Sequence, residues 1–162
     1  MTRALLKEAK FDNCYTTKLN MHLADLTRAT FNKTHLAQAV LVATLVGGTT
    51  WRDTDMQEVD MSGLDLSLKI LSGLNFSRAK LCGVKMFGTE LKGTNLTGAD
   101  LSNADLDNTK MSDAIVSEAV MVGAKLTAAD CALGMLSITS ALSRANRPLQ
   151  LNSPALISAK QP

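Results

Sequence analysis

The feature that most constrains this chain is a large apolar side chain at every fifth residue. From Leu6 to Leu136, 26 of the 27 positions at this spacing are apolar and only Thr16 is polar, although just 46% of the chain is hydrophobic. A period of five fits neither a continuous α-helix, with 3.6 residues per turn, nor a flat strand, with a period of two. The pattern therefore predicts a repeat architecture built from short units.

Each unit also carries a small residue two positions before the large one. Most of these residues are Ala or Thr, and the large exceptions are Leu19, Leu64, Lys69 and Leu74. Residues two apart in an extended segment point to the same side, so both positions are expected to face inward. Eight of the ten glycines share a third phase, two residues after the large position, where a corner is expected. Each unit is thus predicted to form one side of a coil that stacks on its neighbours.

The clearest copies of the repeat are Ala99-Asp100-Leu101-Ser102-Asn103 and Ala104-Asp105-Leu106-Asp107-Asn108. This pattern resembles the A(D/N)LXX motif of the pentapeptide-repeat family, and it continues without insertion from Ala4 to Ile138. The resemblance implies an all-β fold, a right-handed quadrilateral β-helix with four units per coil. We expect about seven coils over residues 1–138. Over residues 139–162 we expect a C-terminal cap and a disordered tail, because residues 133–146 have the spacing of a short capping helix.

Four units per coil place residues that are twenty apart in one column. Phe11, Phe31 and Trp51 then form an inward aromatic column, which we interpret as core filling. Cys14 and Cys131 fall at inward positions and Cys82 at an outward one. Lys69 falls inward, where an unpaired ammonium group is costly, so its stem is expected to reach out to solvent or its coil to be distorted.

The residues give no support for catalysis or for a bound cofactor or metal. Three cysteines without clustered spacing predict free thiols, and His22 and His35 have no third or fourth ligand nearby in the pattern. Cys82 lacks a neighbouring base, and the glycines belong to corners rather than to a phosphate loop. We therefore expect no enzyme and no cofactor.

Charge and hydropathy limit the classes of partner that we expect. A net charge of +2 does not indicate direct nucleic-acid binding. No apolar run approaches the ~18 residues of a membrane span, and the N-terminus has no signal-peptide core, which favours the cytoplasm of a bacterium and leaves translocation by a secretion system open. The first coil has no covering segment in the sequence, so its edge is expected to favour homodimers.

The best candidate for a partner contact is an apolar corner formed by Leu68, Ile70 and Phe87. The main hypothesis is a non-catalytic scaffold for protein–protein interaction, similar to the repeat portions of bacterial secretion-associated and effector proteins. The alternative comes from family members that mimic DNA, bind DNA gyrase and protect it from quinolones. Such mimicry needs an acidic surface along the whole rod, and a basic band interrupts it here: Lys69, Arg78, Lys80, Lys85 and Lys92.

Overall fold

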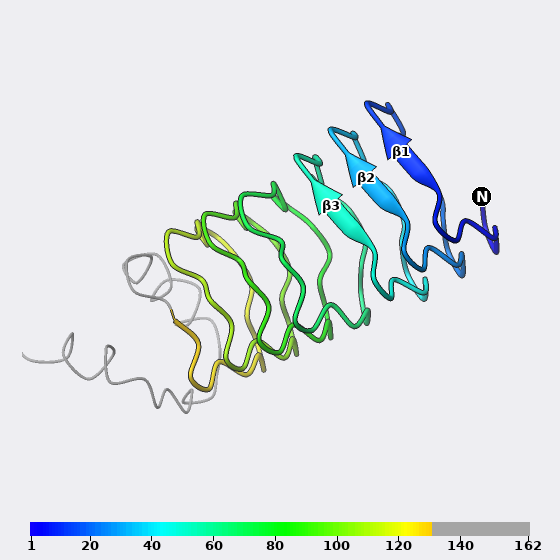
Figure 1. Ribbon diagram of the computed structural model, residues 1–162. Coiled ribbons are helices and arrows are strands. Elements are labelled where there is room, and N and C mark those ends of the chain that lie inside the picture. The colour runs from blue at the N-terminus through cyan, green and yellow to red at the C-terminus, as the bar shows by residue number, and fades with distance from the viewer. Residues whose placement is uncertain (131–162) are drawn as a thin grey trace, which may run out of the picture.

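A computed structural model of the protein describes residues 1–130, which wind into a rod of stacked coils (Figure 1). Three short strands, β1 (Lys10–Asp12), β2 (Thr30–Asn32) and β3 (Thr50–Arg52), form a parallel sheet in the order β1-β2-β3. Each residue pairs with the one twenty positions later, for example Phe11 with Phe31 and Phe31 with Trp51. The same offset recurs in parallel bridges up to the pair of Lys110 and Asp130. This arrangement confirms the quadrilateral β-helix.

The coils are named here by their residues: coil 1 is 1–20, coil 2 is 21–40, coil 3 is 41–60, coil 4 is 61–80 and coil 5 is 81–100. The described residues make roughly six and a half such coils, at the strand spacing of about 4.8 Å. The expected continuation to about seven coils, the helix over residues 133–146, the tail and Cys131 lie outside the described residues.

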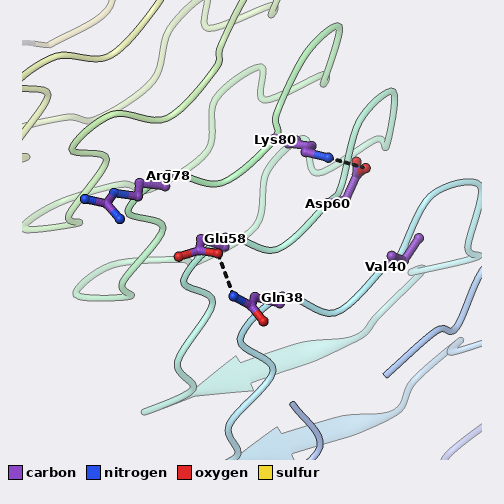
Figure 2. Close-up of a pocket in the computed structure, with 6 residues that line it drawn as sticks. All are labelled: Gln38, Val40, Glu58, Asp60, Arg78 and Lys80. Carbon is purple, nitrogen blue, oxygen red and sulfur yellow. Dashed lines mark hydrogen bonds and ion pairs between the residues drawn. The ribbon is translucent and has the colours of Figure 1, made fainter. Parts of the chain in front are cut away.

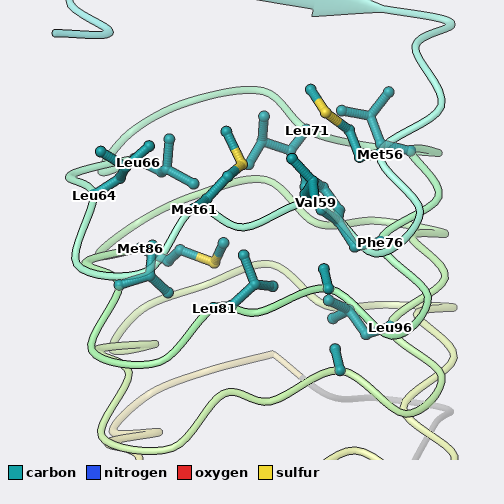
Figure 3. Close-up of a cluster of buried hydrophobic side chains, with 14 of the residues drawn as sticks. Met56, Val59, Met61, Leu64, Leu66, Leu71, Phe76, Leu81, Met86 and Leu96 are labelled. Atoms are coloured by element: carbon teal, nitrogen blue, oxygen red, sulfur yellow. The ribbon is translucent and has the colours of Figure 1, made fainter. Parts of the chain in front are cut away.

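The core follows the two inward phases of the repeat. Every large position from Met21 to Leu126 is buried, and so is every small position from Ala24 to Ala129 except Lys69. Figure 3 shows part of this core, with side chains of successive coils stacked on one another inside the coil. Buried threonines keep their hydroxyls satisfied by donating to backbone carbonyls, as Thr89 does to Leu66 at 2.9 Å. The period of five thus produces a dry interior.

Each unit turns its corner with one residue in the left-handed region. All positions of the third phase from Arg3 to Ala128 have positive φ, and the eight glycines at this phase lie between 63° and 73°. This confirms the sequence interpretation of the glycines as corner residues. Other residues adopt the same conformation here, at a cost of roughly 1–2 kcal/mol each, so stacking of the coils must outweigh this backbone strain.

The Asp or Asn of the motif caps the same corner. The Asp100 carboxylate accepts a hydrogen bond from the Ser102 amide at 2.9 Å, and the Asn95 side chain accepts one from the Thr97 amide at 3.0 Å. These bonds favour the charged carboxylate. Bonds from the Thr27 hydroxyl and amide accordingly lower the pKa of Asp25 below its usual value. The second residue of the motif is therefore a turn cap rather than a partner-binding group.

Coil 1 departs from the expected burial. Its inward residues Leu6, Phe11 and Cys14 are only half-buried, because no further coil covers them in the described structure. The sequence prediction that Cys14 is shielded was therefore wrong in degree, although its position is inward. Cys82, predicted to be an exposed thiol, is half-buried between its column neighbours.

The corner geometry can be tested with two glycines that have equally open surroundings. A Cβ added at Gly93 or at Gly47 meets no atom within 4 Å, but only Gly93 has positive φ, +65°. We expect Gly93→Ala to lower the free energy of unfolding by about 1–2 kcal/mol, and Gly47→Ala to change it by less than about 0.5 kcal/mol. Chemical denaturation measures both, and equal effects would contradict the assigned conformations.

Candidate functional site

The backbone ladder is interrupted at one junction within the described residues, between coils 3 and 4. At the next junction Leu66 donates to the Lys85 carbonyl at 2.7 Å and Lys85 donates to the Leu64 carbonyl at 2.9 Å. The equivalent amides make no backbone hydrogen bond across the junction of coils 3 and 4: Ala43, Val46, Gly48, Trp51 and Asp53 on coil 3, and Asp65 and Ile70 on coil 4. The same junction keeps the bridge of Asp55 with Asn75. We name this interruption the open seam, residues 43–54 and 62–75.

The cause of the open seam is visible in the sequence. Coil 4 places Leu64, Lys69 and Leu74 at three consecutive small positions, directly over Thr44, Thr49 and Thr54. The amides that lose their partners, Asp65 and Ile70, follow Leu64 and Lys69 directly, and their missing acceptors are the Thr44 and Thr49 carbonyls. Overfilled cores displace the backbone. A single large residue is tolerated, since the Leu19 carbonyl still accepts from the Val40 amide at 2.9 Å.

The open seam contains a cleft of about 460 Å³, a volume typical of ligand sites. One wall is β3, whose other edge pairs with β2, so its edge towards the cleft is unpaired. Figure 1 shows β3 as the last labelled strand, followed along the rod by coils without a named strand. The residues that line the cleft are Gly48, Thr49, Thr50, Trp51, Arg52, Asp53, Leu68, Lys69, Ile70 and Ser72.

Trp51 closes the aromatic column at the cleft. The Phe11 and Phe31 rings are stacked with centroids 4.5 Å apart, whereas the Phe31 and Trp51 centroids are 6.4 Å apart. Trp51 is only 5% exposed, which confirms its predicted inward position. Its indole Nε1 is buried without a hydrogen-bond partner, an arrangement that costs stability.

Lys69 occupies the cleft above this ring. Its ammonium lies 5.6 Å from the Trp51 ring centroid, within cation–π range, and donates to the Thr49 carbonyl at 3.4 Å. The ammonium thus bonds the Thr49 carbonyl, which the Ile70 amide would bond in a regular ladder. Burial lowers the pKa of Lys69, partly offset by the charge of Asp65. Of the two alternatives predicted from its inward position, the structure shows the distorted coil, and the side chain itself is half-buried.

The predicted apolar corner lies on the rim of the cleft. Leu68 and Ile70 line the cleft and are 74% and 71% exposed, and Phe87 on coil 5 is 46% exposed. The Leu68 amide donates to the Phe87 carbonyl at 2.9 Å, which holds the two residues side by side. Leu68 and Ile70 therefore line the same cleft as Trp51 and Lys69, and Phe87 lies one coil further along the rod, beside Leu68. Sequence reasoning missed the cleft itself, although the run Leu64, Lys69, Leu74 was its signal.

A second surface carries a ladder of polar pairs on another side of the rod. Figure 2 shows Gln38 donating to Glu58 at 2.7 Å and Lys80 beside Asp60 at 4.0 Å, with Val40 and Arg78 completing the group. Each pair joins residues twenty apart, so the pairs connect adjacent coils. Such exposed pairs contribute little free energy and present no unpaired carboxylates. We interpret this surface as a structural ladder.

The two histidines make contacts between adjacent coils. The ring of His35 stacks on Tyr15 with centroids 4.6 Å apart, and His22 Nδ1 lies 2.9 Å from the Val42 carbonyl. Among residues 1–130, no cluster of three or more His, Cys, Asp or Glu side chains is arranged to hold a metal ion. The same residues include no helix that is long and apolar enough to cross a membrane.

Comparison with known families agrees with this architecture. The family model for pentapeptide repeats matches residues 4–41 and 75–113, in eight copies. The chain belongs to the pentapeptide-repeat family. The stretch between the two matches, residues 42–74, contains the cleft and most of the open seam. This pentapeptide-repeat protein therefore departs from its family pattern where its coils separate.

The chain is similar to several solved structures of pentapeptide-repeat and related proteins. HetL, a pentapeptide-repeat protein involved in heterocyst differentiation regulation in the cyanobacterium Nostoc sp. strain PCC 7120, is 28% identical with a TM-score of 0.54. The match covers 82% of this chain and 61% of the HetL chain, so the protein spans less than two thirds of that relative. Rfr23 of the cyanobacterium Cyanothece 51142 matches at 21% identity over 69% of this chain and 90% of its own, with a TM-score of 0.39. QnrB1, a plasmid-mediated fluoroquinolone resistance protein, matches at 14% identity over 80% and 68%, with a TM-score of 0.41. No curated protein sequence matches this chain.

Amide hydrogen exchange tests the open seam. Ile70 and Glu90 occupy the same column, but only the Glu90 amide has its inter-coil partner, the Lys69 carbonyl at 2.9 Å. Val46 and Leu66 form a second matched pair, in which Leu66 is bonded. We expect the Ile70 and Val46 amides to exchange at least about tenfold faster than their matched partners, because local openings govern exchange. Equal protection within both pairs would show that the ladder is continuous.

Trp51 supplies an independent test of the aromatic column. It is the single tryptophan of the chain and is nearly buried, so its emission should be blue-shifted and poorly quenched by acrylamide. We expect Trp51→Ala to cost about 3 kcal/mol, the low end for large core truncations, since the cleft already leaves one side unpacked. Trp51→Phe, which repeats Phe31, should cost less than about 1.5 kcal/mol. Emission near that of free tryptophan would contradict the inward position.

Proposed function

We propose that this chain is a non-catalytic scaffold that binds a protein partner through the apolar corner and the adjoining cleft. The observation that carries the proposal is the exposure of Leu68 and Ile70 in the lining of the cleft, with the exposed Phe87 beside Leu68 on the next coil. Exposed large apolar side chains beside a cavity are typical of interaction sites. HetL, to which the chain is similar, is a pentapeptide-repeat protein involved in heterocyst differentiation regulation.

The surface chemistry of the described residues supports binding over the alternative of gyrase mimicry. Mimicry of DNA needs a continuous acidic surface. Along this rod carboxylates alternate with cations in the same columns, as in the pairs of Lys80 with Asp60 and Lys110 with Glu90. These cations neutralise the columns on which an acidic stripe would have to run. The proposal therefore favours a mixed polar and apolar partner surface.

The experiment compares two exposed isoleucines at the same phase of the repeat. Ile70 lies in the apolar corner and is 71% exposed, whereas Ile115 lies on coil 6 (residues 101–120) and is 51% exposed. A photo-crosslinking side chain placed at position 87 should capture a distinct protein in the cells that express this chain. We expect Ile70→Lys to abolish that adduct and Ile115→Lys to leave it unchanged.

Both substitutions replace exposed side chains, so neither should change the free energy of unfolding by more than about 0.5 kcal/mol. Circular dichroism during thermal unfolding checks this point. Loss of the adduct with Ile115→Lys, or its retention with Ile70→Lys, would place the contact away from the apolar corner.

A further inference from the structure

The open seam leaves unpaired several backbone groups whose equivalents are hydrogen-bonded at the other junctions between described coils. On coil 3 the Trp51 amide has no acceptor, and on coil 4 the Ile70 amide has lost the Thr49 carbonyl. β3 therefore presents a free parallel edge towards the cleft. Free sheet edges bind extended peptides by adding a strand, with main-chain hydrogen bonds providing affinity.

The charge inside the cleft specifies one side chain of such a peptide. No carboxylate lies within 4.0 Å of the Lys69 ammonium among residues 1–130, and its contacts are the Thr49 carbonyl and the Trp51 ring. Of the other charged residues that line the cleft, Arg52 and Asp53 already face each other at 3.9 Å. The residues that line the cleft carry two cations, Arg52 and Lys69, and one carboxylate, Asp53, so the lining has an excess of positive charge. A carboxylate on the occupant would form a charge-assisted hydrogen bond with Lys69.

From these observations we propose that the cleft binds an extended acidic peptide segment of a protein partner. The segment adds a strand along the free edge of β3, places a carboxylate on the Lys69 ammonium and packs an apolar side chain on Leu68 and Ile70. This inference rests on the proposed function and specifies its partner. It also explains why a half-buried lysine stands in a column whose neighbouring members are Thr49 and Thr89.

The test begins with a selection of short random linear peptides, displayed on phage, against the whole chain, and the enriched pool is then screened for loss of binding to the Lys69→Thr variant. Threonine matches the residues directly above and below, so this variant should fold. Enriched peptides are then synthesised and titrated while the emission of Trp51, the single tryptophan, is followed. We expect enriched sequences to contain Asp or Glu among alternating apolar residues.

Variants of the protein and modified peptides separate the contribution of the Lys69 charge from that of the main-chain hydrogen bonds. Lys69→Met keeps the stem over Trp51 but removes the charge, and should weaken binding by about tenfold, equivalent to ~1.4 kcal/mol. Lys80→Met, in the polar ladder shown in Figure 2, removes a charge elsewhere and should have no effect. A peptide in which Asn replaces the acidic residue should also bind about tenfold more weakly. A peptide with alternate amides N-methylated should not bind, because N-methylation blocks strand pairing.

The outcomes also distinguish this inference from the proposed function. Peptides that bind Lys69→Met as well as the parent but lose affinity for Phe87→Ser would overturn the acidic-strand inference and leave the apolar corner as the binding site. Enriched peptides insensitive to both variants, or no enrichment at all, would overturn both. Inorganic phosphate that shifts Trp51 emission as the peptides do would identify an anion site instead. A concentration-dependent dimer that is lost in Lys69→Met would identify a second copy of this chain as the occupant.

Discussion

Stacking of each residue on the one twenty positions later is the constraint on which the structure depends. It sets the spacing of about 4.8 Å between coils, and it requires the two inward phases to be filled by side chains of fitting size. Where the side chains fit, the amides on both sides of a junction are hydrogen-bonded to carbonyls of the adjacent coil, as those of Leu66 and Lys85 are. The positive φ at each corner is strained for ordinary residues, and the paired ladder stabilises it.

The open seam shows what happens when the size condition fails. Leu64, Lys69 and Leu74 follow one another at positions that elsewhere hold mostly Ala or Thr, and two sides of one junction lose their bridges. A lone Leu19 has no such effect, because its neighbouring units hold the coil in register. Lys69 replaces one of the lost hydrogen bonds by donating to the Thr49 carbonyl. The same displacement leaves a cleft and an unpaired strand edge beside the Lys69 ammonium.

Much of the candidate site could be predicted from the sequence. The columns placed Trp51 inward and brought Leu68 near Phe87, and the inward Lys69 signalled either distortion or a side chain that reaches solvent. The unpaired edge of β3 and the contact between Lys69 and the Trp51 ring were not predictable. They depend on how far and in which direction an overfilled junction opens, and that distance comes from the balance of packing and hydrogen bonding in all four sides of the coil.

The sequence by itself determined the fold, the inward and outward faces, the corners and the columns, because a strict period of five repeats one local geometry and leaves no freedom of register. It also determined that the turn-capping Asp and Asn residues, such as Asp100, lie on the surface. Only the tertiary structure decided which junction opens, how deeply Cys14 and Cys82 are buried, and that the apolar corner borders a cleft. These properties arise between coils rather than within them, since the same unit is shielded or exposed according to the coil stacked against it.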